Sequence, residues 1–142
     1  MNSKPLLIGF FLAVVVITAA SIYISRSVDK PDKTVTSVAS PDGKYKAVRV
    51  TVARGGTQPF CVDTIAVFLS VYPDSFADSD TNYEIYAERC AAPADRATLP
   101  KIEWLARDTL RITVPPEAAG AGVPRKDLDA SLFVHVSYAA AH

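Results

Sequence analysis

The sequence is poor in residues that carry out acid–base or metal chemistry, and it has no excess of charge of either sign. Among 142 residues there are two histidines and two cysteines, and 15 basic residues balance 15 acidic ones. A nucleic-acid-binding protein normally carries a basic excess, because neutralising phosphate groups drives its binding. We therefore expect no nucleic-acid partner.

The few candidate catalytic residues form no catalytic set. His135 lies in an alternating apolar segment and His142 is the last residue, and neither has a cysteine or a second histidine at metal-ligand spacing. The serines occur in no G-x-S-x-G nucleophile motif. The sequence predicts no enzyme, no metal and no cofactor. A hydrolase that uses carboxylates from the acidic segment 74–84 is the alternative.

The most pronounced feature of the sequence is a long uncharged run near its N-terminus. No charged side chain occurs between Lys4 and Arg26, and Leu, Ile, Val, Phe and Ala dominate residues 6–24. As a helix, this run would cross the ~30 Å hydrocarbon layer of a bilayer. We predict a short tail over residues 1–4 and a transmembrane helix or signal anchor over residues 5–25. The alternative is a cleaved signal peptide, because a Thr-Ala-Ala triplet offers small residues before a cut.

The two cysteines indicate the compartment of the remaining chain. Cys61 and Cys90 lie outside the apolar run, with no C-x-x-C motif and no third cysteine. A single cysteine pair in a small exported domain usually forms a disulfide. The alternative is two unrelated buried thiols in a cytoplasmic domain. We predict the disulfide and, with it, a single-pass protein of the inner (cytoplasmic) membrane whose C-terminal domain lies in the periplasm.

The basic residues beside the apolar run do not support this orientation. Lys4 lies on the N-terminal side, whereas Arg26, Lys30 and Lys33 lie on the other side. Basic residues normally stay on the cytoplasmic side of a membrane helix, so their count favours the opposite orientation or neither one. The predicted topology therefore depends on the disulfide.

Short alternating segments predict an all-β domain over residues 38–142, joined to the helix by a polar tether over residues 26–37. These segments are rich in β-branched and aromatic residues, and a strong turn signal occupies residues 40–43. They predict a single antiparallel β-sandwich or a partly open barrel. The expected strands are residues 44–52, 64–72, 83–90, 101–104, 109–114 and 132–138.

The alternation within three segments predicts how they are buried. The apolar positions of segment 44–52 change phase, which predicts a β-bulge near Ala47. Segment 64–72 is apolar on both faces, so we expect a central strand buried on two sides. Segment 83–90 alternates so that Tyr86 shares a face with two glutamates, and we expect this face to meet water.

Two further expectations concern packing. An antiparallel hairpin of segments 64–72 and 83–90 would bring Cys61, before the first strand, beside Cys90, at the end of the second. Trp104, the single tryptophan of the chain, is expected in the hydrophobic core rather than in a binding pocket.

Two polar loops hold the candidate contact residues, since binding residues concentrate on the loops of a rigid β scaffold. These candidates are Arg54 and Gln58 in the loop before residue 61, and Asp74, Asp78 and Asp80 in the acidic segment. Alternate oxygen-bearing residues in the acidic segment begin a calcium-loop pattern, but tyrosine and arginine occupy the positions that need Gly and Glu. We therefore predict a solvated hairpin loop there and no metal site.

One short motif resembles a known repeat unit. Ser40-Pro41-Asp42-Gly43-Lys44 resembles the strand–turn–strand unit of TolB-like β-propeller repeats, and residues 104–112 resemble a degenerate second copy. Residues 40–47 also resemble the opening of small uncharacterised bacterial envelope proteins, which implies a shared fold and no known activity. The copies begin about 65 residues apart, whereas a propeller blade takes ~40–45 residues and a propeller needs about four blades or more. The resemblance therefore covers single hairpins and predicts no propeller.

Together these features predict a non-enzymatic, membrane-tethered binding or assembly module that contacts a protein partner as an accessory component of an envelope complex. A periplasmic immunity-type protein that neutralises an incoming toxin has the same size and layout and is an alternative. The carboxylate-dependent hydrolase is the alternative from a different class, and a concave pocket with convergent acids would favour it.

Overall fold

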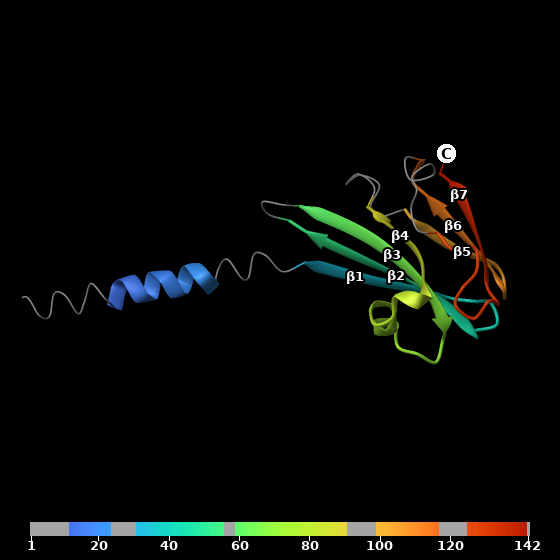
Figure 1. Ribbon diagram of the computed structural model, residues 1–142, viewed down its shortest axis with the longest axis horizontal. Coiled ribbons are helices and arrows are strands. Elements are labelled where there is room, and N and C mark those ends of the chain that lie inside the picture. Colours follow the sequence, from blue (N-terminus) through green and yellow to red (C-terminus); the bar gives the residue numbers. More distant parts are fainter. Residues whose placement is uncertain (1–11, 24–30, 56–58, 91–98, 117–124, 142) are drawn as a thin grey trace, which may run out of the picture.

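The computed structural model describes residues 12–23, 31–55, 59–90, 99–116 and 125–141 (Figure 1). Residues 12–23 are helical, and the later residues form two β-sheets. The prediction of a mainly antiparallel β domain is confirmed. The described strands form a four-stranded and a three-stranded sheet rather than one closed barrel.

The larger sheet, sheet A, is an antiparallel meander. Its strands, in order, are β1 (Asp32–Ala39), β2 (Tyr45–Arg54), β3 (Phe60–Leu69) and β4 (Glu84–Arg89). The predicted turn joins β1 to β2. Gly43 has a φ of +69° there, and the side chains of Ser40 and Asp42 accept backbone amides of the residues that follow.

The smaller sheet, sheet B, mixes both pairing directions. Its strands are β5 (Lys101–Ala106), β6 (Thr109–Val114) and β7 (His135–Ala140). The first two form an antiparallel hairpin, whereas β7 pairs parallel to β6 and so needs a long connection. Part of that connection bridges both sheets, because Arg125 pairs with Tyr86 of β4 and Leu128 pairs with His135 of β7.

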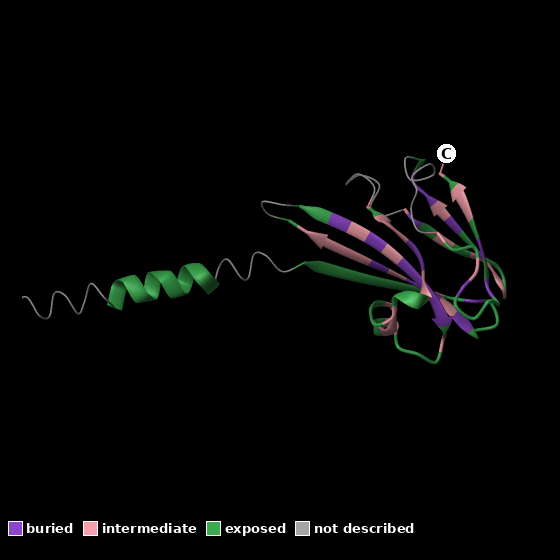
Figure 2. Ribbon diagram, viewed as in Figure 1, coloured by how far each residue is buried: buried purple, intermediate pink, exposed green. Residues whose placement is uncertain are grey.

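The two sheets share one hydrophobic core, which we call the main core (Figure 2). Its buried residues are Tyr45, Ala47, Ile65, Val67, Ile85, Tyr86, Leu110, Ile112, Val114, Val134 and Val136. Trp104 packs against this core while half-buried, and its indole Nε1 donates to the Val38 carbonyl at 2.9 Å. Trp104 thus lies at the seam between β5 and β1 rather than at the centre of the core.

Sheet A has a second core on its outer face. The buried residues there are Val48, Val50, Ala66 and Phe68. Two 3₁₀ segments, η1 (Asp74–Asp78) and η2 (Thr81–Tyr83), cover them. Phe76 and Tyr83 meet Phe68 edge to face, with ring centroids 5.2 and 6.4 Å away. The acidic segment joins β3 to β4 and has no fully buried residue, as expected of a solvated hairpin loop, but its aromatic side chains also pack it on the apolar face of sheet A.

The two cores explain the change of phase along β2. Tyr45 and Ala47 face the main core, whereas Val48 and Val50 face the second core. The pairing register runs past Ala47 without interruption on both sides of β2, so the predicted bulge is wrong. Burial on both faces of the central strand is confirmed for residues 65–68.

A bulge occurs instead in β4. Ile65 pairs with Tyr86 and Ala66 pairs with Glu84, which leaves Ile85 as an extra residue between them. Ile85 and Tyr86 both face the main core as a result, and Tyr86 is 1% exposed. The predicted solvent-facing position of Tyr86 is wrong, because strict alternation ends where a residue is inserted.

The β domain begins earlier than predicted. β1 starts at Asp32 and pairs with β2 along its whole length, so residues 32–37 of the predicted 26–37 tether belong to sheet A. β1 is an edge strand and is exposed along most of its length (Figure 2). Polar side chains are usual for an edge strand. Because β1 has few apolar residues, the sequence pattern did not identify it as a strand. Residues 26–30 lie outside the described residues.

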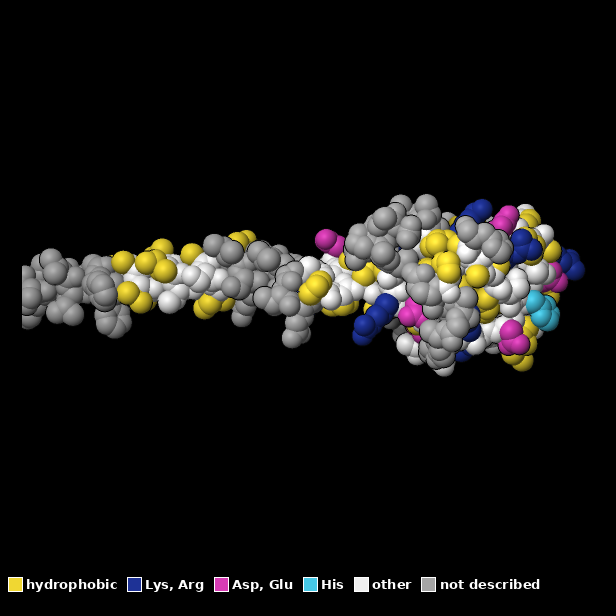
Figure 3. Space-filling view, turned by 90° about the horizontal axis from the view of Figure 1, so that it is seen from above, with side chains coloured by type: hydrophobic (Ala, Val, Ile, Leu, Met, Phe, Trp, Pro, Cys, Tyr) yellow, Lys and Arg dark blue, Asp and Glu magenta, His cyan; other side chains and the backbone are white. Residues whose placement is uncertain are grey.

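The helix over residues 12–23 lies apart from the two sheets (Figure 1), and every residue of it is exposed. Hydrophobic side chains occur along both of its sides (Figure 3). Its hydroxyls bond backwards within the helix, from Thr18 to the Val14 carbonyl at 2.9 Å and from Ser21 to the Ile17 carbonyl at 2.8 Å. Within the described residues, no helix has both the length and the apolar character needed to span a membrane.

The cysteine pair lies in the predicted hairpin. Cys61 and Cys90 form a disulfide with their Cα atoms 5.3 Å apart, and the Cys90 amide donates to the Cys61 carbonyl at 3.1 Å. The bond joins β3 to the residue that follows β4. It lies at the end of sheet A where β1 begins, because Asp32, Ala53 and Cys61 are in register across three strands.

Candidate functional site

Exposed candidate residues lie near both ends of sheet A. We call the end that contains the disulfide and the start of β1 the tether end, and the end that contains the turn at residues 40–43 the distal end (Figure 1). The two ends differ in chemistry, and each has one hollow described below.

The predicted acidic contact residues hold the cover of sheet A in place. Lys46 Nζ lies 2.5 Å from Asp74 Oδ1, and Lys33 pairs with Asp78. Asp80 caps η2 by accepting a backbone amide. The hydrogen bond from Lys46 holds the pKa of Asp74 below its usual value. The structure thus gives these three acids a stabilising role on sheet A.

Arg54 lines a hollow at the tether end. The hollow has a volume of about 480 Å³ and lies where β2 ends, β3 begins and β4 ends. Arg89, Phe60 and the disulfide also line it, and no acidic residue does so among those described. Gln58, the other candidate of this loop, lies outside the described residues.

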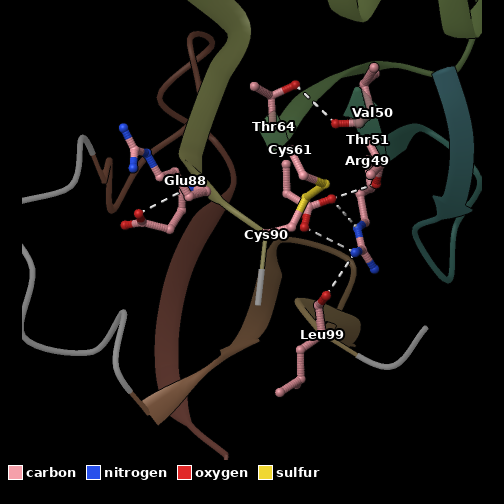
Figure 4. Close-up of a disulfide and its surroundings, with 10 residues drawn as sticks. Arg49, Val50, Thr51, Cys61, Thr64, Glu88, Cys90 and Leu99 are labelled. Carbon is pink, nitrogen blue, oxygen red and sulfur yellow. Dashed lines mark hydrogen bonds and ion pairs between the residues drawn. A yellow bond between two sulfur atoms is a disulfide. The ribbon is translucent and has the colours of Figure 1, made fainter. Parts of the chain in front are cut away.

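An ion pair near the disulfide links sheet A to the residues just before β5 (Figure 4). Arg49 of β2 makes two hydrogen bonds to Asp63 of β3, at 2.9 and 3.1 Å, and donates to the Leu99 carbonyl at 2.7 Å. The Thr51 hydroxyl also donates to Asp63, which is 1% exposed. Both oxygens of this carboxylate accept hydrogen bonds from the protein, so we assign the pair a structural role.

Exposed hydrophobic side chains gather at the distal end on two loops. They lie at the end of β3 and just after it, and in the loop before β7. We call them the distal patch: Leu69, Val71, Tyr72, Leu132 and Phe133. Val71 is 82% exposed and Leu132 is 72% exposed. Single exposed apolar residues are common, whereas a group of them on two adjacent loops indicates a contact surface.

Contacts at the distal end bring these loops together. The Tyr45 ring stacks on Phe133 with centroids 5.5 Å apart, and its hydroxyl lies 3.3 Å from that of Ser131. Lys44 Nζ lies 5.6 and 5.1 Å from the centroids of the same two rings. A hollow of about 130 Å³ opens between the loops, with Tyr72 and Ser131 among its lining residues. That volume equals roughly four water molecules at ~30 Å³ each, or one small apolar side chain.

One buried carboxylate shapes the loop before β7. Asp129 is 2% exposed, and its Oδ1 accepts the amides of Phe133 and Val134 at 3.0 and 2.8 Å. Its Oδ2 accepts the amide and the hydroxyl of Ser131 at 3.1 and 2.6 Å. Leu132, enclosed by these bonds, has a φ of +60°, which is uncommon for any residue with a Cβ. Such strain persists only where surrounding contacts impose it, and it is frequent at functional sites.

Sequence reasoning did not find Asp129 or Leu132. Leu132 begins the strand that we expected over residues 132–138, but β7 begins at His135. An available signal was an aspartate two residues before a serine, Asp129-Ala130-Ser131, which favours a turn stabilised by side-chain bonds. That signal would have separated Leu132 from the strand.

Neither hollow has the paired acids of a hydrolase within the part of the chain described. The hollow at the tether end is lined by two arginines, and the one at the distal end has Asp129, both of whose oxygens accept hydrogen bonds. His135 is exposed at the start of β7 and lines neither hollow. Among the described residues, no three His, Cys, Asp or Glu side chains gather as a metal site would require.

The chain was compared with protein-family models, with curated proteins and with solved structures, and no family model, curated protein or solved structure matches it. Function must therefore be argued from the geometry of the distal patch, the tether end and the helix.

Proposed function

We propose that this chain is a non-enzymatic binding module of the bacterial envelope. In this proposal the N-terminal helix anchors it in the inner membrane, its β-sandwich lies in the periplasm, and the distal patch contacts a protein partner. The distal patch carries the proposal, because five apolar side chains are displayed there on two adjacent loops. One of the loops is held in a strained conformation by a fully bonded carboxylate.

The helix supports the anchor. An exposed helix that is apolar all round needs lipid or protein around it, and Val16, Ile17 and Tyr23 are 63%, 64% and 75% exposed. The hydroxyls of Thr18 and Ser21 bond to the helix's own carbonyls, which is how hydroxyls are satisfied in hydrocarbon. The uncharged run continues beyond the described helix, from residue 5 to residue 25.

The disulfide supports the compartment. Structural disulfides persist in oxidising compartments such as the periplasm and are rare in the cytoplasm. The Cys61–Cys90 bond lies at the end of sheet A closest in sequence to the helix. Both cysteines of the chain are used in it.

The distal patch has features of a protein contact surface. Aromatic side chains are common at such surfaces, and the stacked rings of Tyr45 and Phe133 lie at the distal end, Tyr45 lining the hollow. The loops are fixed by internal hydrogen bonds, so little conformational entropy is lost on binding. We expect a partner that inserts an apolar side chain between Tyr72 and Ser131.

Position-specific photocrosslinking in intact cells tests this function. A benzophenone amino acid replaces Leu132 in the full chain, and we expect one discrete crosslinked adduct. The matched control places the same amino acid at Leu105, which is 46% exposed on β5, and should give no adduct.

A second substitution shows whether the adduct depends on the patch. Val71→Asp, combined with the photoreactive residue at position 132, should abolish the adduct and leave the melting temperature unchanged, because Val71 is 82% exposed. Equal adducts at positions 132 and 105, or an adduct insensitive to Val71→Asp, would show that the distal patch is not the contact surface.

A further inference from the structure

The hollow at the tether end has a chemistry unlike that of the distal patch. Arg54 ends β2, Arg89 ends β4, and Phe60 begins the strand between them. These three side chains and the disulfide line one space of about 480 Å³. Phe60 is 44% exposed, and the described residues that line this space are two arginines, the disulfide and apolar residues. Two guanidinium groups beside an exposed aromatic ring suit an anionic group that is attached to an apolar body.

The position of the hollow indicates which anion it meets. Asp32, where the chain enters sheet A, is in register with Ala53, and Ala53 is in register with Cys61 on the wall of the hollow. From residue 23 to residue 32 the chain is nine residues long, so even fully extended it spans at most about 30 Å. A helix anchored in a bilayer therefore holds this end of sheet A close to the layer of lipid headgroups.

Headgroup chemistry matches the residues of the hollow. Phospholipid headgroups present a phosphate that arginine binds bidentately, and aromatic side chains favour the interface between headgroups and acyl chains. We propose that Arg54 and Arg89 bind the phosphate of an anionic phospholipid while Phe60 lies at the membrane interface. This inference rests on the proposed membrane anchor, and it adds a second attachment that orients sheet A on the membrane.

Lipid binding by the full chain can be counted by native mass spectrometry from neutral detergent micelles. With phosphatidylglycerol and phosphatidylcholine added in equal amounts, we expect roughly tenfold more phosphatidylglycerol adduct on the wild-type chain. Arg54→Gln with Arg89→Gln should reduce phosphatidylglycerol binding to the phosphatidylcholine level. Inorganic phosphate, added at the same concentration as the lipid, should not displace the bound lipid.

The matched control removes the same charge from the opposite end of the domain. Arg107 and Arg111 are exposed in the β5–β6 hairpin, and Arg107 is close enough to Asp42, in the turn of the distal end, to affect its pKa. Arg107→Gln with Arg111→Gln should retain the lipid preference. Equal loss in both double variants would show a general charge effect and would overturn the site.

A second measurement locates the contact. In nanodiscs that contain phosphatidylglycerol, the amides of Phe60, Cys61 and Arg89 in the full chain should exchange with deuterium more slowly than in phosphatidylcholine discs. Unchanged exchange at these amides would overturn the proposal.

Alkaline carbonate extraction separates this inference from the proposed anchor on which it depends. A chain released by carbonate would show that the anchor fails, whatever the lipid counts. A chain that stays in the membrane and shows no preference for phosphatidylglycerol would overturn the headgroup site alone.

Discussion

Asp129 illustrates how one buried side chain can shape a recognition surface. Its two oxygens accept four hydrogen bonds from the five residues that follow it, so the loop before β7 has one conformation available. Leu132 is displayed as a consequence, and the strain at its backbone is offset by those bonds. Binding at the proposed distal patch would therefore depend on a carboxylate that is only 2% exposed.

The Asp129→Asn variant tests this dependence. The amide keeps one acceptor oxygen but replaces the other with a donor, which leaves the Ser131 amide and hydroxyl without their acceptor. We expect the free energy of unfolding to fall by about 1–3 kcal/mol, measured by urea denaturation. The exposed Asp127→Asn is the control and should change stability by less than ~0.5 kcal/mol. Equal stability of the two variants would contradict the assigned role of Asp129.

Tyr86 of the main core and Tyr138, which packs against that core, make the domain sensitive to alkali. Burial raises the pKa of Tyr86 to about 12, with the charge of Glu88 adding to the shift, and burial also raises the pKa of Tyr138. An unfolded tyrosine ionises near pH ~10. The folded state therefore holds these protons more tightly than the unfolded state, and the resulting stability is lost as the pH rises from about 10 to 12.

The alkaline loss can be measured with Tyr86→Phe. Each such tyrosine contributes a slope that approaches ~1.4 kcal/mol of unfolding free energy per pH unit. The variant should therefore lose stability less steeply than the wild type above pH ~10, in urea denaturation series. Between pH ~7 and ~9 the two curves should run parallel. Identical slopes above pH ~10 would show that Tyr86 ionises as freely in the folded state as in the unfolded one.

At the scale of elements, the β3–β4 hairpin is secured at one end by a covalent bond and at the other by packing. The disulfide joins Cys61 to Cys90 at the tether end. At the distal end, Phe76 contacts Phe68 and Tyr83, at centroid distances of 5.2 and 5.1 Å. The segment between the strands therefore belongs to the fold and is not a free loop.

Removing the disulfide should destabilise the domain by about 2–4 kcal/mol in the chain-entropy account. The variant for this measurement is Cys61→Ser with Cys90→Ser, followed by thermal melting. A reductant should lower the melting temperature of the wild type to that of the double variant and leave the variant unchanged. Two alkylatable thiols in the natively exported, unreduced protein would contradict the bond.

The elements that the sequence predicted well are those with one simple burial pattern. The strand predicted over residues 109–114 is β6, and its alternating apolar residues Leu110, Ile112 and Val114 are all buried. The sequence could not show that β2 faces two cores. The second core includes Phe76, which lies far from β2 along the chain. The sequence could not show the bulge at Ile85 either. The bulge is a shift in the pairing of β4 with β3, and the residue types around Ile85 do not reveal it. The distal patch was missed because Leu132 continues the alternating apolar pattern of β7, whereas the hydrogen bonds of Asp129 to the residues that follow it keep Leu132 in the loop.

At the scale of the whole molecule, the two candidate contact surfaces lie at opposite ends of sheet A. β3 spans the sheet from Phe60, beside the tether-end hollow, to Leu69 of the distal patch. Its ten residues measure roughly 33 Å at the usual rise per residue. With the tether end on the membrane, the distal patch would be presented about 30 Å out into the periplasm.

The proposed topology predicts where a C-terminal reporter is active. Alkaline phosphatase fused after His142 should be active, because it folds only after export to an oxidising compartment. The same fusion without residues 1–25 should be inactive, since the apolar run would be missing. Activity of both fusions, or of neither, would contradict an exported domain held by the N-terminal segment.

The order of the strands along the chain has a consequence for biogenesis. Every described strand of sheet A precedes every strand of sheet B in the sequence. If the domain is exported as proposed, its N-terminal part emerges first, so sheet A and the second core can form before β5 to β7 have emerged. The inner face of sheet A would then stay uncovered while roughly fifty further residues are synthesised, which takes about 3–10 s at bacterial rates. Chains arrested between residues 95 and 130 should therefore be sensitive to protease and bound by chaperones, and both properties should disappear once β7 is outside.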